Sequence, residues 1–280
     1  MAWLKGMGFA VCLLFSACAS SVQSPSQPAP IVLMGEVHDN PEAHSQRFRL
    51  IQQWVVQGWR PTVVMEQFDR DTQAQLDQAL TQCDTAQCVI DQPWVQPWDW
   101  PLYTPLIQLA LDNNLPLLAG NVSRADANLI VAKGYSAALD SNTINQFRLN
   151  QPLPVNLQQA QQESIEQGHC NMLPAKVAQK MVRAQVARDV FMAQLLTEQF
   201  KMNRPVVLIA GNGHVRRSVG VPRWLPAKLL EKTVVYGFVE QEGAGHGVEF
   251  DHLQQVPVHP RPDPCEAFKN FQRQQNHVND

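Results

Sequence analysis

The chain contains 280 residues, with 22 basic and 25 acidic side chains and a formal net charge of −3. This balance excludes a strongly basic nucleic-acid-binding protein, because such proteins neutralise phosphates with an excess of lysine and arginine. Charged residues make up 17% of the chain and hydrophobic residues 45%, whereas about 25% of a typical soluble domain is charged. The composition therefore excludes a disordered chain and supplies enough apolar material for a large core.

The first residues have the layout of a bacterial export signal. One early lysine precedes an uncharged apolar run over residues 6–15, which is too short to cross a bilayer because crossing takes about 20 residues. Two small residues and then Cys18 follow. The segment resembles a lipobox, although phenylalanine stands where leucine is usual. We expect a signal peptide over residues 1–17 and a lipid on Cys18; an ordinary signal peptide is the alternative.

Residues 18–30 are polar and rich in proline, so we expect a flexible tether there. The folded domain is then expected over residues 31–265 and a tail over residues 266–280. The lipid is the only membrane attachment that the sequence predicts. Ala19 after the lipidated cysteine resembles an outer-membrane address. We therefore expect a protein of the cell envelope on the outer membrane, facing the periplasm or the exterior.

Short apolar runs bounded by Gly, Pro or Asn alternate with longer amphipathic stretches. Such runs are typical of buried parallel strands, and they cover residues 31–34, 62–65, 115–119, 206–210 and 233–239. Residues 248–250 are a further possible strand. Asn40 and Pro41 open a helical pattern that reaches Gln57. This order predicts a βαβ unit at the start of the domain.

The segment over residues 122–200 has apolar residues at helical spacing and no clear strand, and its clearest helix spans residues 174–199. A further helical pattern covers residues 102–112. The predicted fold class is α/β, with a mainly parallel central sheet flanked by helices. A helical subdomain over residues 122–200 is inserted between strands.

Polar side chains follow three of the predicted strands. Glu36 and His38 follow the first strand, Glu66 ends the second, and His214 follows the fourth in a second Gly-x-x-His motif. Residues i and i+2 of an extended chain point to the same side, and ligands bind at the carboxyl ends of parallel strands. The pattern predicts a divalent-metal or acid–base site. The alternative is that both histidines are turn residues bonded to backbone.

Together these pieces resemble the ChaN-like haem-binding lipoproteins, a branch of the superfamily that includes the Tiki metalloproteases, TraB-type proteins and erythromycin esterases. The matching segments span most of residues 31–225 and include residues 33–40, 66–68, 103–106, 119–121, 169–170, 184–189, 211–214 and 220–222. The resemblance implies an α/β sheet with a helical subdomain, iron-linked expression and haem binding. In the known case a homodimer encloses two stacked haems, with a tyrosine on iron and a histidine of the partner assisting.

Tyr103 is the best candidate for that tyrosine, because it follows the aromatic segment at residues 94–101 and phenolate is a known axial donor. Ordinary packing is the alternative for this aromatic segment. Tyr135 is a second candidate, in a loop, whereas Tyr236 lies in an apolar strand and is expected in the core.

His214 is the predicted histidine of the haem site, and Arg216 and Arg217, with Arg223, are predicted to meet the haem propionates. A basic surface loop is the competing interpretation. Asp189, within the long helix, is expected either to contact the strand-end residues or to face solvent.

Two function classes follow. The favoured one is a haem-binding protein of the envelope, in haem or iron uptake or storage, and not an enzyme. The alternative, by analogy with the Tiki branch, is a metal-dependent hydrolase or peptidase that uses Glu36, His38, Glu66 and His214. A third interpretation is a scaffold in which these residues only hold loops together.

The chain has 6 cysteines, an even number that leaves four beside Cys18 once the signal is removed. In an oxidising compartment, Cys83 and Cys88 are expected to pair across a short loop, leaving Cys170 to pair with Cys265. Four cysteines allow three connectivities, so this pairing is a preference. Cys170 as a ligand to haem or metal is the alternative.

Overall fold

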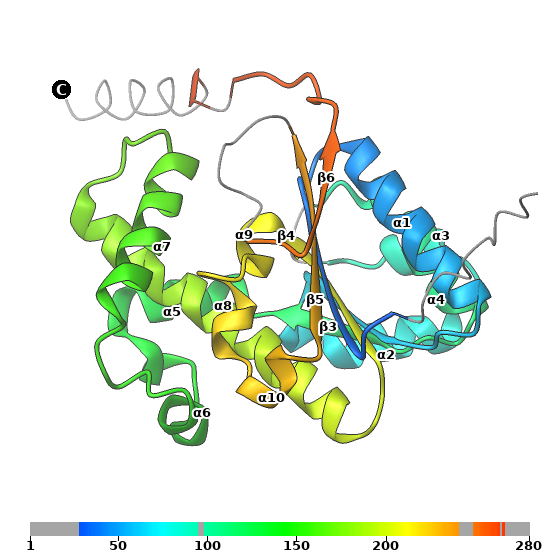
Figure 1. Ribbon diagram of the computed structural model, residues 1–280, viewed down its shortest axis with the longest axis horizontal. Coiled ribbons are helices and arrows are strands. Elements are labelled where there is room, and N and C mark those ends of the chain that lie inside the picture. The colour runs from blue at the N-terminus through cyan, green and yellow to red at the C-terminus, as the bar shows by residue number, and fades with distance from the viewer. Residues whose placement is uncertain (1–27, 95–97, 241–248, 264, 267–280) are drawn as a thin grey trace, which may run out of the picture.

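The computed structural model describes residues 28–94, 98–240, 249–263 and 265–266. Its centre is a six-stranded sheet in the order β3-β2-β4-β1-β5-β6 (Figure 1). Every strand pairs in parallel with its neighbours. The strands are β1 (Ile31–Glu36), β2 (Thr62–Asp69), β3 (Leu117–Asn121), β4 (Val206–Gly211), β5 (Thr233–Glu240) and β6 (His252–Val256). The predicted α/β class with a parallel sheet is confirmed.

The sixth strand does not lie where the sequence indicated. Glu249 and Phe250 are not in a strand, Val248 lies outside the described residues, and β6 begins at His252. Phe250 is buried against Gly237 of β5, where a Cβ would come within 2.5 Å of its ring. The side chain of Phe250 therefore packs into the core just before β6 begins. The strand itself is mostly polar because it forms an exposed edge.

Helices cover both faces of the sheet (Figure 1). One face carries α1 (Pro41–Val56), α2 (Gln73–Gln82), α3 (Ala86–Ile90) and α4 (Thr104–Asp112). The other carries α8 (Ala175–Lys201), α9 (Asn212–Val215) and α10 (Ala227–Leu230). The predicted start of α1 is confirmed, because Asn40 Oδ1 accepts a hydrogen bond from the Ala43 N–H at 3.0 Å.

Alternate residues of each central strand enter different cores, as the period of two requires. In β1, Val32 and Met34 pack with α1 to α4, whereas Ile31 and Leu33 pack with α8 to α10. Residues of β2 and β4 divide in the same way. Both faces are covered, which explains why these strands are apolar runs without alternation in the sequence.

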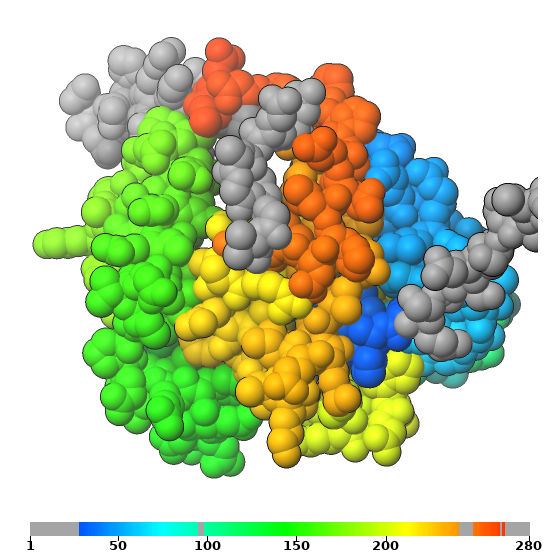
Figure 2. Space-filling model, viewed as in Figure 1, coloured from blue at the N-terminus to red at the C-terminus, as the bar shows by residue number. Residues whose placement is uncertain are grey.

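The chain between β3 and β4 is helical in the structure, as expected. It contains α5 (Arg124–Lys133), α6 (Ser141–Gln146), α7 (Val155–Gly168) and α8, with the short 3₁₀ helix η3 (Tyr135–Ala137). These helices have a core of their own around Val182, Val186 and Val190 of α8. The long helix α8 therefore packs both in this core and in the core that it forms with the sheet. Figure 2 shows this helical region (green) on one side of the molecule and α1 (blue) on the other.

Both preferred disulfides are present. Cys83 is bonded to Cys88 and Cys170 to Cys265, with Cα–Cα distances of 5.5 and 5.6 Å. The second bond ties the end of α7 to the C-terminal segment and occupies the thiol of Cys170. Cys18 lies outside the described residues. Within the described part of the chain, no helix combines the length and the hydropathy needed to span a bilayer.

Candidate functional site

Three neighbouring strands bring the predicted polar residues to one edge of the sheet. Since β2, β4 and β1 are adjacent, their carboxyl ends place the side chains of Glu36, His38, Glu66 and His214 close together. His38 Nδ1 lies 3.0 Å from Glu36 Oε1, and its Nε2 lies 4.0 Å from Glu66 Oε2. His214 Nε2 lies 3.4 Å from Glu66 Oε1. We call these four residues the strand-edge cluster.

Glu36 is buried beneath His38 and is surrounded by donors. Its Oε1 accepts hydrogen bonds from the Tyr103 hydroxyl at 2.5 Å and from Gln67 Nε2 at 3.1 Å. Its Oε2 forms an ion pair with Arg47 of α1, whose side chain is also buried. Burial lowers the pKa of Arg47 to about 10, so the guanidinium stays charged at neutral pH. This pair stabilises a buried carboxylate that has no access to water.

Three further residues of the site were not predicted from the sequence: Arg47, His44 and Gln67. Arg47 donates to His44 Nδ1 at 3.0 Å, and His44 Nε2 donates to the His38 carbonyl at 3.0 Å. Burial lowers the pKa of His44 to about 4, so this imidazole is neutral and accepts and donates at once. The available signal was their spacing, because His44 and Arg47, the fourth and seventh residues of α1, lie on the same face of the helix as the apolar Ile51.

Tyr103 is fully buried, and its hydroxyl is committed to Glu36. Burial raises the pKa of the phenol well above its ordinary value. The ring of His44 lies edge-on at 4.8 Å, and those of Trp98 and Trp100 at 6.2 and 6.1 Å. Its role as an axial ligand stays a prediction, and it requires the hydroxyl to leave Glu36 and to lose its proton.

His38 is the accessible member of the cluster. Its side chain is 42% exposed, whereas that of Glu36 is fully buried, and its ring lies 4.9 Å from that of Trp98. A Cβ at Gly211 would come within 2.7 Å of His38 Nε2. Glycine at this position therefore lets the imidazole approach the end of β4. The arrangement fixes Nδ1 on a carboxylate and turns Nε2 toward Gly211 and Glu66.

His214 is buried between two carboxylates. Its Nδ1 donates to Asp189 Oδ1 of α8 at 2.5 Å, and its Nε2 faces Glu66. Burial favours the neutral ring, but Glu66 and Asp189 outweigh it and raise the pKa of His214 to about 10. Burial opposes ionisation of Glu66 as well, yet His214 holds the pKa of Glu66 well below its ordinary value. Of the two alternatives for Asp189, contact with the strand-end residues is correct.

Two of the three arginines predicted to bind propionates have protein partners, whereas Arg223 has no ion pair among the described residues and lines a separate cavity. Arg216 pairs with Glu249 at 3.2 Å, and Arg217 pairs with Asp251 at 2.5 Å and donates to the Thr233 carbonyl at 3.0 Å. These contacts tie the loop after α9 to the segment before β6. Their role in binding propionates stays a prediction that requires them to exchange partners.

The divalent-metal alternative finds no support in the donor set. Among the described residues, no group of three or more His, Cys, Asp and Glu side chains is arranged to hold a metal ion. Glu36 already binds the Arg47 guanidinium, and His214 is held as a cation between two carboxylates. A protonated imidazole and a carboxylate paired with arginine are not available as ligands.

Comparison with known proteins gave one family and several structures. The model of the family described as "Haem-binding uptake, Tiki superfamily, ChaN" matches residues 24–225. A Campylobacter jejuni ChaN structure with cofacially bound haem is similar over 81% of this chain and 87% of that one, with 19% identity and a TM-score of 0.64. An erythromycin esterase in its open conformation gives 12% identity over 76% of this chain and 70% of that one, with a TM-score of 0.44. No curated protein sequence matches the chain.

The buried Arg47–Glu36 pair predicts a large asymmetry between two arginines of α1. Arg47→Met leaves a buried carboxylate without its cation, so we expect a loss of about 3–5 kcal/mol in the free energy of unfolding. Arg49→Met removes an exposed guanidinium paired with Glu42 and is expected to leave stability almost unchanged. Urea unfolding measures both, and Glu36→Gln added to Arg47→Met should restore part of the loss. Equal effects of the two single variants would contradict a buried pair.

The raised pKa of His214 predicts a pH dependence of stability. The folded state holds a proton that the unfolded imidazole releases near its ordinary pKa of about 6.5. The stabilisation is therefore complete below that pH and is lost as the pH rises to about 10. Between pH 7 and 10 we expect the free energy of unfolding of the wild type to fall more steeply than that of His214→Gln. Parallel curves would show that His214 is neutral in the folded protein.

Proposed function

Because the chain belongs to the haem-binding uptake family of the Tiki superfamily that includes ChaN, we propose that it is an envelope protein that binds haem for uptake or storage. The family match over residues 24–225 carries this proposal. Haem is then the cargo of the protein and not a resident catalyst. The accessible part of the strand-edge cluster supports the proposal, as follows.

His38 suits the iron of haem. Its Nδ1–H donates to the buried Glu36 carboxylate, which fixes the ring and leaves the Nε2 lone pair for a ligand. A carboxylate behind a ligating imidazole orients the ring, and imidazole is a common axial donor to haem iron. Trp98, whose ring contacts His38, offers an apolar surface to a flat macrocycle. These residues therefore fit the group that the family implies.

The remaining predicted residues are not assigned to the iron in this proposal. His214 and Glu66 hold the ends of β2 and β4 together beneath His38. Arg216 and Arg217 can meet propionates only by leaving Glu249 and Asp251. We expect His38 to be the iron donor in one subunit. We propose that the protein binds haem as a homodimer with stacked haems. Measuring the molecular mass of the protein during the haem titration tests this assembly, because a homodimer has twice the mass of one chain.

A haem titration tests this assignment. Residues 29–280 titrated with haemin are expected to give a saturable Soret shift. His38→Ala should weaken binding at least about tenfold and change the position of the band, because the axial donor is lost. His252→Ala is the matched control, because it removes an exposed histidine of β6. This variant should leave the spectrum unchanged.

Two outcomes of this titration would change the proposal. Absence of any saturable shift in the wild type would overturn haem binding. A changed Soret band in Tyr103→Phe together with an unchanged one in His38→Ala would assign the iron to Tyr103. We expect the opposite result, a changed band in His38→Ala and an unchanged one in Tyr103→Phe, because the buried Tyr103 hydroxyl already donates to Glu36.

We also propose that Cys18 carries the lipid that attaches the protein to the outer membrane. When the full chain is produced in bacteria with labelled palmitate, we expect the label in the protein and the protein in the membrane fraction. Cys18→Ser should lose both, whereas Cys12→Ser, within the same leader, should keep both. Labelling of the Cys18→Ser protein would place the lipid elsewhere.

A further inference from the structure

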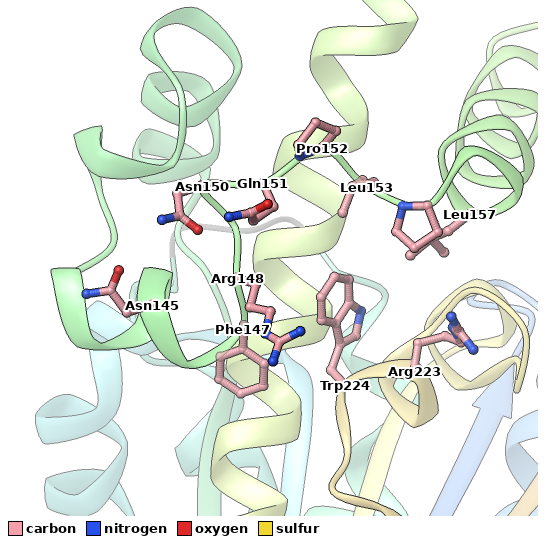
Figure 3. Close-up of a pocket in the computed structure, with 11 residues that line it drawn as sticks. Asn145, Phe147, Arg148, Asn150, Gln151, Pro152, Leu153, Leu157, Arg223 and Trp224 are labelled. Atoms are coloured by element: carbon pink, nitrogen blue, oxygen red, sulfur yellow. The ribbon is translucent and has the colours of Figure 1, made fainter.

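A cavity of about 630 Å³ lies apart from the strand-edge cluster. Its walls come from the chain between α6 and α7 and from the 3₁₀ helix η4 (Val221–Trp224) (Figure 3). None of the residues that line it belongs to the strand-edge cluster. Cavities of about 300–1,000 Å³ are the usual size of small-molecule sites.

The cavity is positively charged. Arg148 lines it from the segment between α6 and α7 and Arg223 from η4, and no aspartate or glutamate is among the lining residues. Within the described part of the chain, neither guanidinium has an ion pair, whereas Arg216 and Arg217, in the loop between α9 and η4, each have one. Arg148 also has a positive φ of 53°, which is uncommon for a residue with a side chain. Two unpaired guanidinium groups therefore share one cavity.

An indole N–H in the wall also lacks an acceptor. Trp224 Nε1 is buried, and no described protein atom accepts its hydrogen bond. Figure 3 shows this nitrogen on the side of the ring that faces Arg223. The ring of Phe147 lies edge-on to Trp224 at 6.4 Å. Because an unsatisfied buried donor is costly, an acceptor from outside the chain, supplied by water or by a ligand, would stabilise this N–H.

We propose that this cavity is a second ligand site, which binds a planar organic carboxylate. Guanidinium groups bind carboxylates with two parallel hydrogen bonds, and Arg148 and Arg223 supply two such groups. Phe147, Trp224, Leu153 and Leu157 supply aromatic and aliphatic walls. An inorganic anion would satisfy the arginines but would leave these apolar walls without a partner. The acid-free lining excludes an organic cation as the preferred ligand.

The site uses none of the residues assigned to iron, but it does use Arg223, which the sequence pattern assigned to the haem propionates. Haem is itself planar and carries carboxylates, so the experiment includes haemin as a competitor. The probe is phthalate, a benzene ring with two carboxylates, added to the purified protein. Binding is followed by the indole N–H resonance of Trp224 in ¹H–¹⁵N spectra, which Trp224→Phe identifies by its loss.

We expect phthalate to shift the Trp224 resonance saturably, and benzamidine, a cation of similar shape, to leave it unchanged. Arg148→Gln and Arg223→Gln should each raise the Kd of phthalate at least about tenfold, since each removes a charged hydrogen-bond partner. Arg183→Gln is the matched control: it removes an arginine that lines a neighbouring cavity and should leave the Kd unchanged. Because all three arginines are exposed, these variants are expected to fold.

Three results would overturn the proposal: no shift with phthalate, equal effects of Arg223→Gln and Arg183→Gln, or displacement of phthalate by haemin at stoichiometric concentration. The last would assign the cavity to the haem site. Phthalate binding in a protein that shows no Soret shift would overturn the haem proposal alone.

Discussion

The ion pair between Arg47 and Glu36 is the interaction on which the strand-edge cluster depends. Glu36 ends β1 at the centre of the sheet, where burial alone would disfavour its charge. Arg47 supplies the opposite charge from α1, and Tyr103 and Gln67 donate to the other oxygen. The charged carboxylate can then hold Nδ1 of His38 from below. One buried anion therefore orients the accessible imidazole.

A second charged group lies beside the first and has a different function. His214 bridges Asp189 of α8 and Glu66 of β2, and Glu66 also accepts from the Gly211 N–H at 2.8 Å. This connects the long helix to two strands at the edge where the ligand is proposed to bind. The two Gly-x-x-His motifs look alike in the sequence. In the structure one histidine is half-exposed and the other is buried as a cation.

The fold was largely predictable because buried parallel strands leave apolar runs that need no knowledge of their neighbours. All five expected strands are present, and α1 starts at its Asn40 cap. The exception is β6, a polar edge strand, whose sequence carries no such run. The site was predictable in part. Glu36, His38, Glu66 and His214 follow strands and meet as expected. Arg47 and His44 lie within α1, where their spacing marks a buried face but does not identify the partner that each residue meets.

The sequence by itself determined the order of the elements, the polar residues at the strand ends, the preferred cysteine pairs and the family resemblance, since each of these is written in local pattern or in motifs. Only the tertiary structure decided which cation meets which carboxylate. Arg47 binds Glu36, Asp189 binds His214, and Arg216 binds Glu249. These pairs join distant segments, and their choice follows from burial, because a charge removed from water must take the partner that packing places beside it.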